Sequence, residues 1–298
     1  MFEYSKAYKP FEYPWAVDLV KEHEKVHWIE DEVDLSEDVY DWNHRLTEVE
    51  KGHLVQILRI FTESDVVVGQ YYYESLIPAI RNNELRNMLG SFAAREGIHQ
   101  RAYALLNDTL GLPESEYSAF RDYFQSKDKI EYMGVSGDDF AGTVAKGVFN
   151  EGVMLFGSFV MLLNYSRFGK MKGMCTITEW SLRDESIHVA GLVELYKAIG
   201  LKVDLEKYAR ACYELECSFV DLVYEMGMVE GLAVDEVKQY LAFMVDYRLV
   251  QLGGSVIYGA SNPLKWLDDI LNGMDFSNFF EKRVTEYGKG LGGEWDYE

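Results

Sequence analysis

The chain has 298 residues, of which 48% are hydrophobic and 14% aromatic, so it can bury a substantial core. The 50 acidic residues exceed the 29 Lys and Arg and give a formal net charge of −21, which argues against binding to nucleic acid. The three cysteines form neither a CxxC pair nor an even-numbered disulfide framework, which favours a reducing, cytoplasmic setting.

The N-terminal segment, MFEYSKAYKPFEYPW, lacks the basic start and the apolar stretch of a signal peptide. The longest apolar run, residues 152–163, is too short to span a bilayer. We therefore expect a protein that neither enters nor crosses a membrane.

Apolar residues recur at steps of three and four over long windows, which is the helical period, and only 5 prolines interrupt the chain. We therefore expect an all-α fold. The expected helices span residues 46–80, 83–110, 114–126, 138–167, 174–199, 205–226 and 234–258. Several of them are longer than the usual globular helix, which indicates a bundle with one continuous core.

Four acidic residues occupy positions where these helices require apolar ones. Asp65 lies on the stripe that also carries Phe61, and the stripes of three later helices carry the other acids. These acids are Glu96, Glu151 and Glu185. Isolated buried carboxylates are costly, so four of them need a compensating partner. Two divalent cations would balance their charge.

Two of the acids belong to Glu-x-x-His pairs, and this spacing places both side chains on one helical face. Each half of the chain thus supplies one carboxylate helix followed by one Glu-x-x-His helix. This is the layout of dinuclear metal sites in ferritin-like bundles. The six candidate ligands are Asp65, Glu96, His99, Glu151, Glu185 and His188.

The same spacing occurs twice more, from Glu24 to His27 and from Glu50 to His53. These pairs lie in the charged stretches KEHEKVH and TEVEKGH, and we interpret them as solvated helix faces or N-terminal caps. The Glu-x-x-His spacing alone is therefore weak evidence for a metal site, and the prediction rests on the repeated layout of carboxylates.

Carboxylate oxygens combined with imidazole suit iron or manganese, whereas the lack of cysteine ligands argues against structural zinc. We expect two iron ions. Manganese or a mixed manganese/iron pair is an alternative that the sequence does not separate from iron. Buried ion pairs without a metal are the other interpretation.

Tyr103 lies four residues after His99, hence on the same helical face and roughly 6 Å along the axis from it. A phenol in that place could give an electron and a proton to an oxidised metal pair and become a tyrosyl radical. An ordinary core tyrosine is the alternative.

Four segments resemble the small, radical-generating subunit of class I ribonucleotide reductase. They are SDVVVG around Asp65, REGIHQRAY at 95–103, FNEGVMLFGSF at 149–159 and LRDESIH at 182–188. The resemblance runs from about Val26 to Tyr287. It implies that Tyr103 holds a stable radical. It also implies one metal on Asp65, Glu96 and His99 and a second on Glu151, Glu185 and His188, with some carboxylates bridging.

The resemblance further implies a path for the radical. Asp184 would link the metal-bound His99 to Trp28, which lies in the segment HWIEDEVDLS. Tyr287, in KRVTEYGKG, would pass the radical into a large catalytic subunit. The polar tail, residues 281–298, would be flexible and would dock on that subunit, beyond a single ferritin-like domain at residues 1–280.

The implied assembly is a homodimer that works with the large subunit and is activated by molecular oxygen or by an oxidant from another protein. Two features depart from the family pattern: Leu155 stands where many members have phenylalanine, and only 11 residues follow Tyr287. Two other functions stay open. A dinuclear oxidase or hydroxylase would act directly on an organic substrate without the relay, and a ferritin-like storage subunit would usually be shorter.

Overall fold

The computed structural model describes residues 1–273, and the chain divides into two compact units, Met1–Ser261 and Asn262–Glu298. Within the described residues the structure has no β-strand, and a single isolated bridge pairs Val229 with Leu232. The predicted all-α fold is therefore confirmed. The predicted limits of the domain and of the tail stay a prediction.

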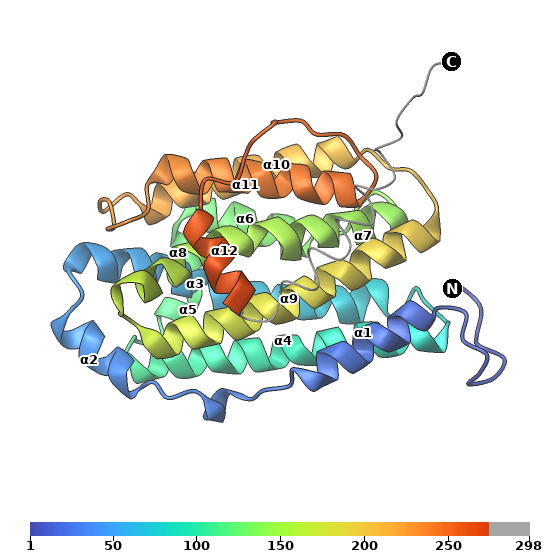
Figure 1. Ribbon diagram of the computed structural model, residues 1–298, viewed down its shortest axis with the longest axis horizontal. Coiled ribbons are helices and arrows are strands. Elements are labelled where there is room, and N and C mark those ends of the chain that lie inside the picture. Colours follow the sequence, from blue (N-terminus) through green and yellow to red (C-terminus); the bar gives the residue numbers. More distant parts are fainter. Residues whose placement is uncertain (274–298) are drawn as a thin grey trace, which may run out of the picture. The chain divides into compact units, whose positions relative to one another are not determined.

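Four helical segments form the core of the first unit. They are α3 (Glu48–Gln70), α4 (Asn83–Thr109), the run of α7 (Phe140–Phe149) and α8 (Phe156–Leu163), and α9 (Lys172–Ile199). Helix α3 packs against α4, α4 against α9, and α9 against both α7 and α8 (Figure 1). The predicted core helices are thus present, and each buries the apolar stripe that carries its acidic residue.

Side-chain caps explain where these helices begin. Thr47 and Glu50 form a capping box at the start of α3. The Asn82 side chain accepts hydrogen bonds from the backbone at the start of α4, and Asp139 accepts one from Gly142 at the start of α7. Helix α9 ends at Ile199 and is capped by Gly200, which adopts a left-handed conformation with φ of 71°.

Two π-helical turns interrupt the core helices. The turn η2 (Tyr71–Leu76) continues α3, and the turn η4 (Asn150–Met154) joins α7 to α8. Two buried basic side chains donate hydrogen bonds to backbone carbonyls of η4: Lys129 to Met154 at 2.8 Å, and Arg248 to Gly152 at 3.1 Å. A π turn adds a residue to the helical repeat and redirects the side chains that follow.

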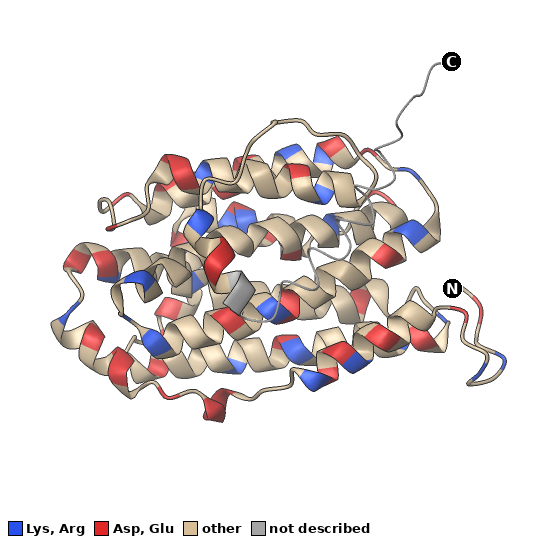
Figure 2. Cartoon of the chain, in the orientation of Figure 1, with Lys and Arg blue, Asp and Glu red and all other residues tan. Residues whose placement is uncertain are grey.

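Outer helices cover this core. Helices α10 (Leu205–Val223) and α11 (Val234–Gln251) pack on each other, with α10 against α7 and α11 against α8. Helix α1 (Pro14–Lys25) packs on α4 and α9, and α2 (Ser36–His44) packs on α9. Acidic side chains, which outnumber basic ones, are spread along these helices (Figure 2).

The outer helices differ from the prediction in several places. The helices α1 and α2 were not expected. The expected helix at 114–126 is instead α5 (Glu116–Ala119), a 3-10 turn (Phe120–Asp122) and α6 (Phe124–Gly134), because Tyr123 is extended with φ of −116° and ψ of 119°. The expected helix at 234–258 stops at Gln251, because Asp246 accepts hydrogen bonds from four consecutive backbone N–H groups at 257–260 and holds that loop out of helix.

The second unit contributes α12 (Lys265–Gly273) to the described residues. Asn262 precedes this helix, accepts a hydrogen bond from the Leu264 backbone at 2.8 Å and donates to Asp268 at 3.0 Å. The side chain thus fixes the start of a helix that the sequence did not predict.

One helical run, Phe140–Phe168, is long and apolar enough to cross a membrane by length and composition. Its most apolar window is entirely buried among the other helices. Core helices of soluble proteins meet the same criterion, so the run is explained by its place at the centre of the bundle.

Candidate metal centre

The structure brings all six predicted ligand side chains together between the four core segments. Asp65 comes from α3, Glu96 and His99 from α4, Glu151 from η4, and the last pair from α9. That last pair is Glu185 and His188. Each of the six side chains is at most 2% exposed. Potential ligand atoms form two groups, each within 4.8 Å: Asp65, Glu96 and His99 in one, and Glu96, Glu151, Glu185 and His188 in the other.

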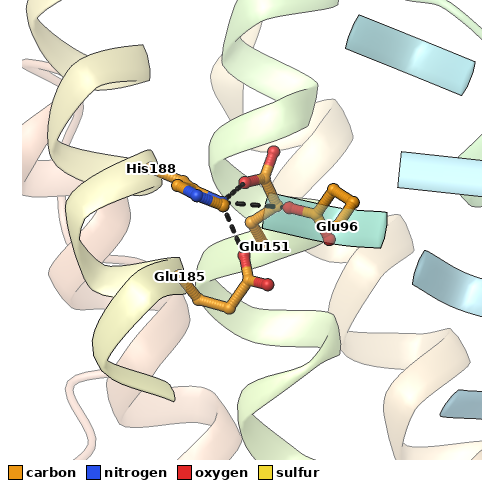
Figure 3. Close-up of side chains that lie close together, drawn as sticks. All are labelled: Glu96, Glu151, Glu185 and His188. Atoms are coloured by element: carbon orange, nitrogen blue, oxygen red, sulfur yellow. Dashed lines mark ion pairs between the residues drawn. The ribbon is translucent and has the colours of Figure 1, made fainter. Parts of the chain in front are cut away.

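His188 is the centre of the second group. Its Nδ1 lies 3.1 Å from Glu96 Oε1, 3.2 Å from Glu151 Oε2 and 3.4 Å from Glu185 Oε2 (Figure 3). Three carboxylates from three different elements therefore converge on one imidazole nitrogen.

His99 occupies the matching place in the first group. Its Nδ1 lies 3.2 Å from Glu185 Oε1 and 3.5 Å from Glu96 Oε2. Glu96 and Glu185 thus each face both histidines with different oxygens. This is the placement that bridging carboxylates require between two metal positions.

The cluster lacks the partners that buried charges need. Apart from contacts with the two histidine rings, the oxygens of Glu96 and Glu185 and Oδ2 of Asp65 have no hydrogen-bond donor within residues 1–273. Such orphaned oxygens are costly in a protein interior. A pair of divalent cations would satisfy them, and the oxygen and imidazole donor set fits iron or manganese.

Without a cation, protons must compensate the acidic charge. Burial raises the pKa of Asp65 well above its usual value and that of Glu151 to about 8. Burial opposes the charged form of Glu185 as well, but the two histidines outweigh it and lower the pKa of Glu185 to about 2. Burial would lower the pKa of His188, but the carboxylates around it raise that pKa well above its usual value. Metal binding would displace these protons.

The outward nitrogen of His99 meets the predicted aspartate. His99 Nε2 lies 3.2 Å from Asp184 Oδ2, and the same oxygen accepts a 2.7 Å hydrogen bond from Trp28 Nε1. Arg95 donates to the other oxygen at 2.8 Å. Burial would raise the pKa of Asp184, but His99 and Arg95 hold it well below its usual value, so Asp184 is ionised. His99, Asp184 and Trp28, which the resemblance links in a radical path, therefore do lie within hydrogen-bond distance of one another in series.

The loop that carries Trp28 is fixed by two arginines. Arg95 and Arg183 both donate to the Val26 carbonyl, at 3.3 Å and 2.8 Å. The Trp28 ring is 2% exposed and stacks on His99, with ring centroids 5.9 Å apart. Its position depends on core helices far away in sequence.

The outward nitrogen of His188 meets a residue that the sequence did not single out. His188 Nε2 lies 3.2 Å from His23 Nε2, and His23 Nδ1 lies 2.8 Å from Ser91 Oγ, which donates to Glu24 at 3.0 Å. His23 is fully buried, although it lies in KEHEKVH, which was interpreted as a solvated face. Glu24 and His27, the pair for which that interpretation was made, are exposed, whereas the helix α1 packs His23 against α4 and α9.

A second missed residue is Tyr72. Its hydroxyl lies 2.9 Å from Oε1 and 2.7 Å from Oε2 of Glu151. Burial and the neighbouring carboxylates raise the pKa of Tyr72 well above its usual value, so it keeps its proton and donates. The run YYY at 71–73 gives no pattern that marks the middle tyrosine.

The other Glu-x-x-His matches lie outside the cluster. Glu50 caps α3 with Thr47, as the cap interpretation expected. His53 is only 1% exposed and its Nδ1 lies 3.2 Å from the Tyr165 hydroxyl, so it is a core residue and not part of a solvated face.

Tyr103 is 1% exposed, and its ring stacks on Phe61 with centroids 4.4 Å apart. Its hydroxyl has no hydrogen-bond partner within the described chain. Burial, with the charge of Asp65, raises the pKa of Tyr103 well above its usual value. Leu155, the departure from the family pattern, is buried where η4 meets α8. Tyr287 and the tail at 281–298 lie outside the described residues.

Comparisons with known proteins agree with this geometry. The family model described as "Ribonucleotide reductase, small chain" matches residues 5–263. A probable ribonucleoside-diphosphate reductase small subunit of Invertebrate iridescent virus 3 is 38% identical over 327 aligned positions, covering 97% of this chain and 86% of the relative.

Solved structures show the same fold. The R2 subunit of ribonucleotide reductase from Clostridium botulinum has a TM-score of 0.80 and 21% identity, covering 89% of this chain and 90% of that one. The dimanganese(II)-NrdF of Streptococcus sanguinis has a TM-score of 0.75 and 19% identity, covering 91% of this chain and 100% of that one.

Proposed function

This chain belongs to the family of ribonucleotide reductase small chains, and from that premise we propose that it forms and stores a tyrosyl radical for a catalytic large subunit. The observation that carries the proposal is the buried cluster of four carboxylates and two histidines on the bundle helices, one of which also bears Tyr103. The large subunit would use the radical to reduce ribonucleoside diphosphates to deoxyribonucleotides.

Asp65, Glu96 and His99 would hold one metal, and Glu151, Glu185 and His188 the other. When bound, two iron or manganese ions would supply the oxidising equivalent for Tyr103, with molecular oxygen or a protein-supplied oxidant as the electron acceptor. The protein would supply a dry, fixed site for that chemistry.

The surroundings of Tyr103 suit a stored radical. Oxidation would remove one electron and the phenolic proton from Tyr103, and both would go to the oxidised metal pair that Asp65, Glu96 and His99 would help to hold. The stacked ring of Phe61 and the near-complete burial of Tyr103 would keep water and reductants away from the radical.

The radical would leave through the hydrogen-bonded chain His99, Asp184 and Trp28. Asp184 would keep His99 oriented with Nδ1 toward the metal and would accept the indole N–H of Trp28. Tyr287 and the docking tail would continue the path to the large subunit. We place this assembly in the cytoplasm as a homodimer, with neither nucleic acid nor membrane as partner.

Electron paramagnetic resonance on the full-length protein tests the proposal. After metal loading and oxidation, the wild type should show a tyrosyl-radical signal, and Tyr103→Phe should lose it with its metal content unchanged. Tyr165→Phe is the control, since Tyr165 is equally buried but lies beside His53, away from the cluster. Oxidised protein that is radical-free yet active with its large subunit would contradict the Tyr103 assignment.

A further inference from the structure

Among the candidate carboxylate ligands, Glu151 is set apart by its hydrogen bonding. Both of its oxygens face the Tyr72 hydroxyl, whereas those of Glu96 and Glu185 have no donor besides the histidine rings within the described residues. We propose that Tyr72 is a positioning residue that holds the Glu151 carboxylate in place for the second metal. The inference rests on the proposed two-metal function.

The donor itself is rigidly placed. Tyr72 is fully buried in the π-helical turn η2, and its ring packs edge-on against Phe92 at 6.2 Å and His188 at 6.1 Å between centroids. A side chain packed on all sides loses little further freedom when it donates a hydrogen bond, so its hydroxyl marks one fixed point beside the second metal position.

The neighbouring tyrosine anchors the turn that carries this donor. Tyr71 donates to the Thr143 carbonyl of α7 at 2.8 Å. Its ring lies directly over Gly147, where an added Cβ would come within 2.4 Å of the Tyr71 hydroxyl. The two tyrosines therefore tie the Asp65 helix to the run that bears Glu151, one through the backbone and one through the carboxylate.

Glu151 needs such a tether because of its location. It lies in a π-helical turn, between two segments of α-helix, where the backbone repeat is irregular. The single O–H of Tyr72 is within hydrogen-bond distance of both carboxylate oxygens and so restricts their rotation. The outer hydrogen-bond partners of ligands govern metal affinity, commonly by roughly 10- to 100-fold.

The effect should be confined to one metal position. Tyr72 contacts Glu151 and packs on His188, which both belong to the second group, and no hydrogen bond joins it to Asp65 or His99 in the described chain. Loss of the Tyr72 hydroxyl should therefore weaken the second metal and leave the first nearly unchanged.

Calorimetric titration of the metal-free, full-length protein with Mn²⁺ under anaerobic conditions tests this. Tyr72→Phe keeps the ring and should raise the Kd of one of the two Mn²⁺ sites by roughly tenfold while the Kd of the other stays unchanged. Tyr165→Phe is the matched control, because it removes a buried phenol hydrogen bond that ends on the Glu50 backbone carbonyl, outside the cluster. It should bind two Mn²⁺ as the wild type does.

The outcomes separate this inference from the proposed function. Wild-type protein that binds fewer than two Mn²⁺ would contradict the two-metal function itself. Two Mn²⁺ with unaltered affinities in Tyr72→Phe would overturn the role of Tyr72 alone. An equal loss in Tyr165→Phe would also overturn it, by showing that loss of any buried phenol hydrogen bond has this effect, and thermal melting of both variants checks that each is folded.

Discussion

Trp28 and Asp184 are 156 positions apart in the sequence, and the indole Nε1 donates a buried 2.7 Å hydrogen bond to the carboxylate. This bond joins the loop after α1 to the helix α9, and the same oxygen of Asp184 faces His99. A buried carboxylate that serves an aromatic ring and a candidate metal ligand at once is a natural point for transfer of charge out of the core.

Replacing Trp28 by Phe should separate radical storage from radical use. The ring volume is largely kept, but the donor to Asp184 is lost, so the Tyr103 signal should persist while turnover with the large subunit falls, roughly 10- to 100-fold or more. Trp180→Phe is the control, because Trp180 packs on Trp28 at 5.2 Å between ring centroids and makes no hydrogen bond to Asp184 in the described part of the chain. Full turnover in Trp28→Phe would refute the relay.

Lys129 and Glu216 form a fully buried ion pair at 2.7 Å, beside the turn that carries Glu151. Lys129→Met should lower the free energy of unfolding by about 3–5 kcal/mol at pH 8, because it leaves the Glu216 charge uncompensated. Urea unfolding measures this. Lys127→Met, on the exposed face of the same helix, should leave the midpoint unchanged, and equal midpoints for both variants would contradict the role of the pair.

Glu216 should also make stability depend on pH. Burial raises its pKa from 4.5 to about 7, against the opposing effect of Lys129. The protonated folded form therefore contributes stability that is complete below pH 4.5 and is lost as the pH rises through about 7, at up to about 1.4 kcal/mol per pH unit. The difference in unfolding free energy between wild type and Glu216→Gln should follow this slope. A difference independent of pH would show that Glu216 titrates normally.

Asp38 should be important for the stability of α9. It reaches from α2 and accepts hydrogen bonds from the backbone N–H groups of Gly173 at 2.7 Å and Met174 at 2.8 Å. Asp38→Ala should cost about 2 kcal/mol, because both groups are buried and lose their acceptor. Glu37→Ala, an exposed acid on the same helix, serves as control. Equal melting temperatures for Asp38→Ala and Glu37→Ala would exclude this capping role.

The core of the fold and the six clustered side chains could be predicted from sequence because buried charge breaks a regular pattern. Asp65 and Glu185 interrupt apolar stripes that the structure buries completely. The helical period then fixes which residues share a face, and the Glu-x-x-His spacing fixes how His188 follows Glu185. These signals are local, so one sequence suffices to read them.

The outer partners could not be predicted, because they depend on tertiary packing. His23 lies in a charged stretch, and only the packing of α1 on α4 and α9 buries it. Tyr72 is flanked by Tyr71, which bonds the backbone, and by Tyr73, which is 56% exposed. Three identical residues thus have three different roles, which differ only in what lies opposite each side chain.

The irregular elements were missed for a related reason. The π turn at 150–154 adds one residue to a helical repeat, and no proline or glycine cluster marks it in the sequence. Two of its backbone carbonyls accept hydrogen bonds from Lys129 and Arg248, which lie on other helices. The helices α1 and α2 are short, and short helices depend mainly on packing for their stability.

Anomalous X-ray diffraction from crystals loaded with Mn²⁺ tests the central claim most directly. The account predicts two anomalous peaks per chain inside the bundle, one beside Asp65 and His99 and one beside Glu151 and His188, with Glu96 and Glu185 between them. A single peak, or none within the cluster, would contradict a two-metal centre.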